Sequence, residues 1–133
     1  MTYMLDKSLL RRNFVVLAGS QAWAYPLAEN IAPDDAVFIS SDQRAEPSWL
    51  TAAQGRKLLG STVSGVVMDT QAGFDPDLFA LVAGSIEGGG VLVLLVPELK
   101  DWPKQPHSPA AQRFLTRLVS KIKSHAGVVL INE

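Results

Sequence analysis

The sequence predicts an α/β fold: a doubly wound, mainly parallel sheet of five strands that forms a three-layer α/β/α sandwich with its helices. Five short apolar runs alternate with segments of helical periodicity, which is the pattern of βαβ units joined by right-handed crossovers. The run at 91–96 contains no polar residue, as expected of a strand whose two faces are both covered. At 133 residues, the chain has the length of one domain with a single core.

The stretch 65–97 gives the clearest βαβ pattern. Asp75 followed by Pro76 is typical of a helix N-cap and a first helical residue, where the missing proline N–H has no consequence. Apolar residues then recur at three- and four-residue steps and predict one buried helix face. That face consists of Leu78, Leu81, Val82 and Ile86. The glycines at 88–90 are expected to end the helix in a turn, ahead of the strand at 91–96.

The other strands are predicted from shorter apolar runs. They are expected at 14–18, 36–40, 66–68 and 128–131. The polar-free runs at 14–18 and 91–96 should occupy the centre of the sheet. The strand order is either 3-2-1-4-5 or 2-1-3-4-5, and the pattern does not decide between them. Residues 1–12 are expected to form a short helix or a lead-in segment.

Three more helices should cover this sheet. The first spans about 22–30 with Trp23, Leu27 and Ile31 on its inner face. Pro26 must lie in its first turn, or the helix starts there, because later positions need the N–H. The other two helices are expected from a cap at Ser48 or Thr51 to Leu59, ahead of Gly60, and over 110–123 with Phe114, Leu115, Leu118, Val119 and Ile122 inward.

Composition and charge exclude several classes of protein. The formal net charge of −1 gives no global basic field for nucleic acid. The absence of cysteine excludes disulfides, thiolate metal sites and cysteine nucleophiles, and it fits a cytoplasmic protein. The longest apolar run, 91–96, is too short to span a bilayer, so no membrane partner is expected. Because the sequence stops directly after a buried strand, we expect 1–133 to be one domain of a longer protein.

Open parallel sheets bind ligands at the carboxyl ends of their strands, and three predicted strand-end loops carry polar side chains there. The candidate residues are Ser20, Asp42 and Asp69. Asp69 either binds magnesium, as a nucleotidase carboxylate would, or accepts hydrogen bonds from loop amides, which is the favoured interpretation. No phosphate-binding loop motif is present, and His107 and His125 are too isolated for a metal site. No catalytic, cofactor-binding or metal-binding residue is therefore predicted.

Two features could contact RNA. Trp102 either stacks on a base or, as favoured here, covers the edge of the sheet. Arg113, Arg117 and Lys121 are spaced by four along one predicted helix, with Lys123 nearby. This basic stripe either contacts RNA phosphates or is an ordinary solvated face, and the second interpretation is somewhat favoured.

The stretch 66–97 resembles the N-terminal domain of bacterial tRNA(Met) cytidine acetyltransferases. That family has an apolar strand ending in aspartate, a Gly-Phe-Asp helix start, and a glycine-rich turn into an apolar strand that ends in proline. The matching residues are Asp69, Gly73, Phe74, Asp75, the glycines at 88–90, and 92–97. Looser matches are Gly19 with Trp23, 58–60, and Trp102. The resemblance extends from about Phe14 to Trp102.

The resemblance implies the accessory domain of a modular enzyme. The family acetylates N4 of the wobble cytidine in elongator methionine tRNA with acetyl-CoA, and it hydrolyses ATP or GTP with magnesium. A helicase-like module and an acetyltransferase module would follow this domain in the same chain. Neither module's site is present here, so no catalytic residue carries over. The domain alone is expected to be inactive, to pack against the helicase-like module, and to contact tRNA weakly or indirectly.

Two other functions remain open from the sequence. The chain could be a free-standing nucleotide- or cofactor-binding α/β protein that uses its strand-end loops, although this would need a phosphate-binding loop. It could also be a pure protein-interaction domain.

Overall fold

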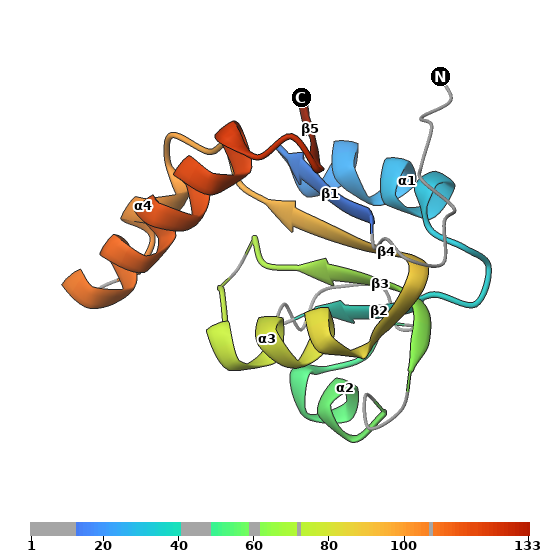
Figure 1. Cartoon of the computed structure of the whole chain (residues 1–133). Helices are drawn as coiled ribbons and strands as arrows, with labels where there is room; N and C mark the ends of the chain where they lie inside the picture. The colour runs from blue at the N-terminus through green and yellow to red at the C-terminus, as the bar shows by residue number, and fades with distance from the viewer. Residues whose placement is uncertain (1–12, 41–48, 59–61, 72, 107) are drawn as a thin grey trace.

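The computed structural model describes residues 13–40, 49–58, 62–71, 73–106 and 108–133. One parallel sheet has the strand order β2-β3-β4-β1-β5 (Figure 1). Its strands are β1 (Asn13–Ala18), β2 (Val37–Ser40), β3 (Val63–Asp69), β4 (Ile86–Val96) and β5 (Val128–Asn132). The helices are α1 (Gln21–Ile31), α2 (Ala52–Leu58), α3 (Pro76–Ser85), the short 3₁₀ helix η1 (Trp102–Lys104) and α4 (Pro109–Ser124).

The sheet confirms the predicted parallel α/β class, but both predicted strand orders are wrong. Each of those orders places the first strand beside the second, whereas β1 lies between β4 and β5, and β2 lies at the edge. The polar-free strands are interior, as predicted, and Leu94 is fully buried. The short β2 suits an edge, because its first two residues, Val37 and Phe38, are only half-buried. The connection from β1 to β2 therefore crosses over β4 and β3.

Helices cover both faces of the sheet. Alternate residues of β1 show the division: Val15 and Leu17 pack with α1, whereas Val16 and Ala18 pack with α3 and α4. Helix α1 contacts the sheet through Ala24 and Ala28, which are both fully buried. The larger side chains predicted to face inward are only half-buried beside these alanines. They are Trp23, Leu27 and Ile31.

Pro26 lies inside helix α1, so both predicted positions of this proline, in the first turn or at the helix start, are wrong. The helix begins at Gln21 after an N-cap at Ser20, and Pro26 lies in its second turn. A proline there leaves the carbonyl of Ala22 without its intrahelical donor. Both Ala22 and Pro26 are exposed, so water can solvate that carbonyl.

The glycines at 88–90 lie inside β4, and not in a turn between helix and strand as predicted. Val63 pairs with Ile86 and Gly65 with Val91, so four residues of β4 bulge between two paired positions. Gly89 has φ of 82°, a conformation that favours glycine. A Cβ on Gly90 would lie 2.6 Å from the carbonyl oxygen of Ser64, so only glycine fits against β3 there.

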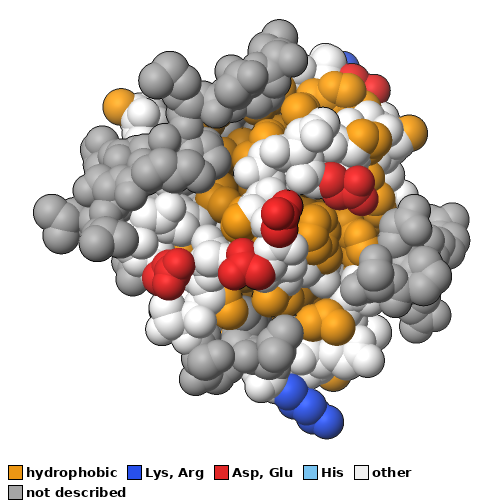
Figure 2. Space-filling model, turned by 90° about the vertical axis from the view of Figure 1, so that its right-hand side faces the viewer, with side chains coloured by type: hydrophobic (Ala, Val, Ile, Leu, Met, Phe, Trp, Pro, Cys, Tyr) orange, Lys and Arg blue, Asp and Glu red, His pale blue; other side chains and the backbone are white. Residues whose placement is uncertain are grey.

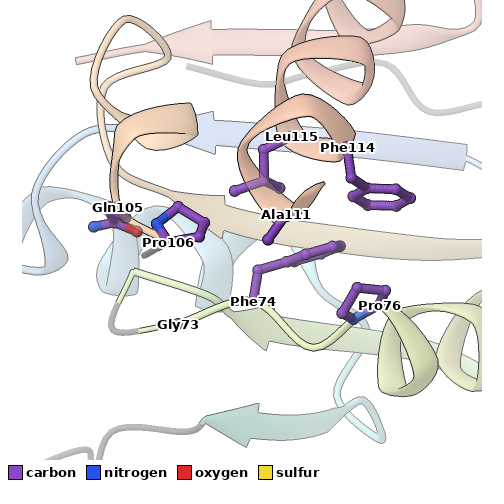
Figure 3. A pocket seen from close by; sticks show the side chains of 8 residues that line it. All are labelled: Gly73, Phe74, Pro76, Gln105, Pro106, Ala111, Phe114 and Leu115. Carbon is purple, nitrogen blue, oxygen red and sulfur yellow. The ribbon is translucent and has the colours of Figure 1, made fainter. Parts of the chain in front are cut away.

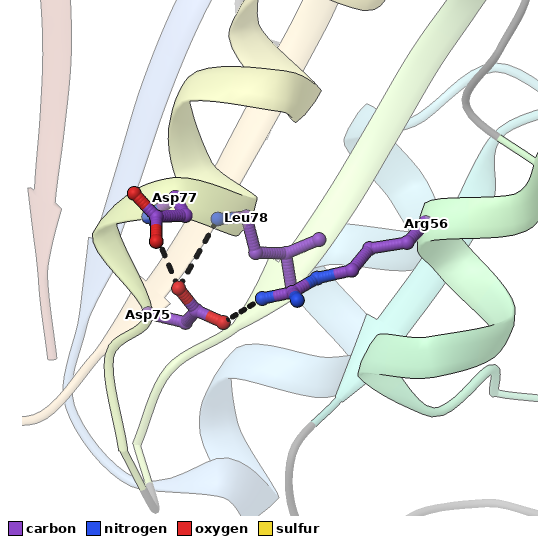
Figure 4. A network of polar contacts seen from close by, with 4 residues as sticks. All are labelled: Arg56, Asp75, Asp77 and Leu78. Atoms are coloured by element: carbon purple, nitrogen blue, oxygen red, sulfur yellow. Dashed lines mark hydrogen bonds and ion pairs between the residues drawn. The ribbon is translucent and has the colours of Figure 1, made fainter.

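Helix α3 begins as predicted, but it ends at Ser85, before the glycines at 88–90 that were expected to stop it. Asp75 is its N-cap, and its Oδ1 accepts hydrogen bonds from the backbone N–H groups of Asp77 (3.0 Å) and Leu78 (3.2 Å), as Figure 4 shows. Oδ2 of the same carboxylate pairs with Arg56 of α2, which links the two helices. Leu81, predicted to face inward, is 38% exposed.

Helix α2 confirms one of its two predicted caps. Thr51 Oγ1 accepts from Gln54 N–H at 3.2 Å, and Gln54 Oε1 accepts from Thr51 N–H at 2.9 Å, which is a reciprocal capping box. Ser48 and the predicted helix end at Leu59 and Gly60 lie outside the described residues. None of the helices in the described ranges is long and apolar enough to cross a membrane.

Candidate functional site

The carboxyl edge of the sheet is the first candidate site, because the chain leaves neighbouring strands toward opposite faces there. After β1 it turns into α1 on one face, and after the adjacent β4 it leads to α4 on the other face (Figure 1). Such a switch point forms the crevice in which open α/β sheets bind ligands. Ser20 and Asp69 both lie at this edge, as predicted. Asp42 lies outside the described residues.

Ser20 is hydrogen-bonded to a carboxylate of the chain itself. Glu133 Oε2 accepts a hydrogen bond from Ser20 N–H at 2.7 Å, and its Oε1 accepts one from the Ser20 hydroxyl at 2.9 Å. The backbone N–H of Glu133 also donates to Ala18 O at 2.9 Å. An anionic group at a helix N-terminus is favourable because the helix dipole is positive there. Glu133 thus fills the position in which such folds hold a phosphate.

Gly19 brings this carboxylate close to α1. A Cβ at Gly19 would lie 2.6 Å from Glu133 Cβ and 2.9 Å from Trp23 Cε3. Any larger residue would push Glu133 or Trp23 aside. This close packing gives a physical reason for the glycine and the tryptophan, Gly19 and Trp23, that resemble the first loop and helix of the family.

Asp69 accepts hydrogen bonds from several elements at once and is only 2% exposed. Gln71 N–H donates to its Oδ1 at 2.9 Å. Three side chains donate to its Oδ2. They are the Tyr25 hydroxyl, Gln21 Nε2 at 3.2 Å and Ser40 Oγ at 3.4 Å. The favoured interpretation, a carboxylate that accepts from a loop amide, is confirmed.

Two further contacts close the edge around Asp69. Gln71 Nε2 donates to Gly19 O, which joins the loop after β3 to the loop after β1. The Tyr25 ring stacks on Trp49, with ring centroids 4.5 Å apart and planes 13° from parallel. Within the described ranges, no group of three or more histidine, aspartate or glutamate side chains could hold a metal ion. Chemically, the edge is a network of hydrogen bonds that links strands to α1, in which the buried Gln71 Oε1 has no partner among the described residues.

The sequence singled out Asp69 and Ser20 but missed their partners. Tyr25 and Gln21 are one helical turn apart, and this spacing could have indicated that both point to the same edge. Glu133 follows the last strand, but its contact with Ser20 joins residues 113 positions apart, and only the strand order reveals it. His125 accepts from Gly127 N–H at 3.0 Å in the turn before β5, and His107 lies outside the described residues.

Trp102 is fully buried in the core between η1, α3 and α4, so it cannot stack on a base without unfolding. Its ring meets Phe74 edge-on, with centroids 5.5 Å apart and planes at 85°. The favoured interpretation, that this tryptophan covers the edge of the sheet, fits this buried position better than stacking on a base.

Helix α4 carries the basic stripe on its exposed side. Arg113, Arg117 and Lys121 are all exposed and succeed one another at four-residue steps. Lys123 does not extend the stripe, because at about 100° per residue it lies roughly 160° around the helix from Lys121. Instead it borders a separate pocket of about 440 Å³ near β5. That pocket is also lined by Glu98, Lys100, Asn132 and Glu133.

Phe114 was predicted to face inward, and this is wrong: the side chain is 41% exposed. The buried line of α4 consists of Leu115, Val119 and Ile122. At about 100° per residue, Phe114 lies on the flank of that line, toward Arg117. Its ring is stacked on Phe74, with centroids 5.9 Å apart and planes at 25°.

An open pocket of about 360 Å³ lies beside these two rings (Figure 3). Phe74 and Pro76 form one side at the start of α3, and Ala111, Phe114 and Leu115 form the other on α4. Gln105 and Pro106 border it from the segment before α4, and the Gln105 amide donates to Gln71 O at 3.2 Å. The pocket therefore connects the basic helix with the start of α3.

Comparison with known families decides what this chain is related to. The family model described as "tRNA(Met) cytidine acetyltransferase TmcA, N-terminal" matches residues 7–133. The chain belongs to this family. The resemblance seen in 66–97 is thereby confirmed, and the match also includes α4 and β5, where the sequence pattern was loose.

Curated relatives in the TmcA family agree with this assignment. Proteins named tRNA(Met) cytidine acetyltransferase TmcA from Nitrosococcus halophilus and Haloferax volcanii are each 31% identical to the chain, over 140 and 141 residues. Each alignment covers 92% of this chain and 19% of the relative. The protein of that name from Salmonella typhimurium is 32% identical over 98 residues, 71% of this chain. The chain spans about a fifth of the length of the first two relatives.

Proposed function

We propose that this chain is the non-catalytic N-terminal domain of an enzyme that acetylates N4 of the wobble cytidine in elongator methionine tRNA. The family match over 7–133 carries the proposal. In such an enzyme, acetyl-CoA and ATP or GTP with magnesium would bind to an acetyltransferase module and a helicase-like module elsewhere in the same protein. The domain would pack against the helicase-like module, and the enzyme would work in the cytoplasm on its tRNA.

The strand-end crevice supports a non-catalytic role. Its two candidate residues, Ser20 and Asp69, already bind groups of the chain itself. A free-standing nucleotide-binding protein would need a phosphate position at the start of α1, and the Glu133 carboxylate takes that position. The cofactor-binding alternative is therefore disfavoured.

The basic stripe of α4 supports a local contact with tRNA. Arg113 and Lys121 are eight positions apart, so the stripe is roughly 12 Å long at a rise of 1.5 Å per residue. This length could place cationic groups near two phosphates of one strand. With a net charge of −1, any such contact has to be local and weak.

Deletion of the gene that encodes this chain tests the proposal. N4-acetylcytidine in elongator methionine tRNA, measured by mass spectrometry of nuclease digests, should disappear and return with the whole gene. Restoration by a gene that lacks codons 1–133 should be incomplete. A second arm incubates the purified 133-residue chain with tRNA, acetyl-CoA, ATP and magnesium, and no acetylation is expected. Unchanged N4-acetylcytidine after deletion would refute the proposed function.

A further inference from the structure

Positive and negative charges are segregated among the described residues of this nearly neutral domain. Helix α4 contains four basic residues and no acidic one. Figure 2 shows the face where the strands begin, and among the described residues acidic side chains gather there between hydrophobic ones, with basic side chains at the margin. Exposed acidic residues of α1, the α1–β2 turn and the start of β4 are Glu29, Asp34, Asp35 and Glu87. A polyanion should therefore approach α4 and avoid this opposite edge.

The exposed ring of Phe114 lies within the basic side of α4. Arg113 precedes it directly, and Arg117 is its i+3 neighbour on the helix surface. The Phe74 ring packs against Phe79, Trp102 and Phe114. The Phe114 ring, in contrast, is partly exposed to solvent, where it lines the 360 Å³ pocket.

We infer that the Phe114 ring and the pocket beside it bind one unpaired base of an RNA loop, while Arg113 and Arg117 contact the flanking phosphates. This inference rests on the proposed function and specifies which part of the RNA the domain would recognise. Proteins bind single-stranded RNA by stacking splayed bases on aromatic rings and by holding the backbone with basic side chains. The pocket has the volume of a small-molecule site, which is ample for one base.

The charges around the pocket favour RNA over an apolar segment of another protein. An apolar segment would need only the rings and prolines, and it would gain nothing from a helix whose charges are all of one sign. The exposed Asp77 follows the pocket residue Pro76 on α3, so the phosphates are expected along α4 and the base beneath them. The Gln105 amide at the rim adds a polar group within reach of a base edge.

Fluorescence anisotropy with the 133-residue chain tests this. The probes are an RNA hairpin with a seven-nucleotide loop and a blunt duplex with the same stem sequence. The hairpin should bind more tightly than the duplex. Phe114→Ala and Phe114→Leu should each weaken hairpin binding by about fivefold or more, because stacking is lost, whereas Phe114→Tyr should bind like the parent. Leu81→Ala is the matched control, because Leu81 is 38% exposed and lies outside the pocket.

Each outcome of this assay either supports or overturns the inference that Phe114 binds an unpaired base. Equal binding of hairpin and duplex, or hairpin binding that Phe114→Leu leaves unchanged, overturns the inference and leaves the ring as a docking surface for protein. Thermal melts of all variants should agree within a few degrees, because Phe114 is half-exposed. If N4-acetylcytidine depends on the gene but hairpin binding does not depend on the ring, only this inference fails. If acetylcytidine does not depend on the gene, the proposed function fails whatever the ring binds.

Discussion

Glu133 and Ser20, 113 positions apart, are joined by two hydrogen bonds, which the backbone N–H and the hydroxyl of Ser20, the N-cap of α1, donate to the Glu133 carboxylate. The contact links the end of β5 to the loop after β1, at the point where the chain leaves adjacent strands toward opposite faces. It therefore fixes the geometry of the crevice that related architectures leave open for a ligand.

Replacing Glu133 by alanine should lower the free energy of unfolding by about 1 kcal/mol, because an exposed charge-assisted hydrogen bond is weakened by solvent. Urea melts monitored by circular dichroism measure the change. Glu98→Ala is the control, since Glu98 pairs with Lys100 on the surface, and its loss should stay within about 0.5 kcal/mol. Equal effects of the two variants would show that the link to Ser20 contributes nothing to stability.

Leu94→Ala should cost about 2–5 kcal/mol, the usual range for truncation of a fully buried leucine. Val129→Ala on the edge strand β5 is the comparison, because Val129 is 38% exposed and should cost far less. A loss below about 1 kcal/mol for Leu94→Ala in a urea melt would contradict the central position of β4.

The hydrogen bond from Tyr25 to Asp69 should be strong, because it reaches a buried carboxylate. Tyr25→Phe keeps the ring that stacks on Trp49 and should cost about 1.5–3 kcal/mol. Asp69→Asn should cost more, since an amide group would then face the donors of Tyr25 and Gln21. A double-mutant cycle in urea should give a coupling of at least about 0.5 kcal/mol, and strict additivity would show that the two groups act independently.

The 133-residue chain should bind neither ATP with magnesium nor acetyl-CoA in isothermal titration calorimetry. The reason is physical: Glu133 occupies the start of α1, and Asp69 is saturated by donors. Glu133→Ala, which vacates that position, is the informative variant. Micromolar affinity of the parent chain for either ligand would revive the cofactor-binding alternative.

The basic stripe should contribute a salt-sensitive part of tRNA binding. Arg113→Ala with Arg117→Ala and Lys121→Ala should weaken binding and flatten its dependence on salt between about 50 and 200 mM, because fewer counterions are released. Lys123→Ala is the matched control, since it removes one charge from the other side of α4. An unchanged salt slope in the triple variant would make the stripe an ordinary solvated face.

Local patterns were sufficient for the elements and their class. The strand at 91–96, the Asp75 cap and the Thr51 cap follow from interactions within a few residues, and all three are present. The strand order could not be predicted from the sequence, because it depends on which strands, far apart in the chain, pair with each other. Phe114 was misplaced for a subtler reason: on a helix, the residue next to the buried line can lie on either side of its boundary, and the neighbouring helix decides which.

The candidate site, too, could be predicted from the sequence only in part. That Asp69 and Ser20 lie at one edge follows from parallel strands alone. That they are already satisfied depends on Tyr25, Gln71 and Glu133, which approach from three different elements. Gln71 follows Asp69 by two positions, and its hydrogen bond was within reach of the sequence, whereas no spacing connects Tyr25 to Asp69 or Glu133 to Ser20. The closed state of the crevice therefore became visible only in three dimensions.

The place of β1 in the sheet has a consequence for synthesis on the ribosome. Both of its neighbours come much later in the chain: Val15 pairs with Val93 and with Val129. At about 5–20 residues per second, the apolar strand β1 of the nascent chain would wait several seconds for its first partner strand. During that interval both edges of β1 are open to wrong pairings, and chaperones that shield such edges should influence the yield of this domain.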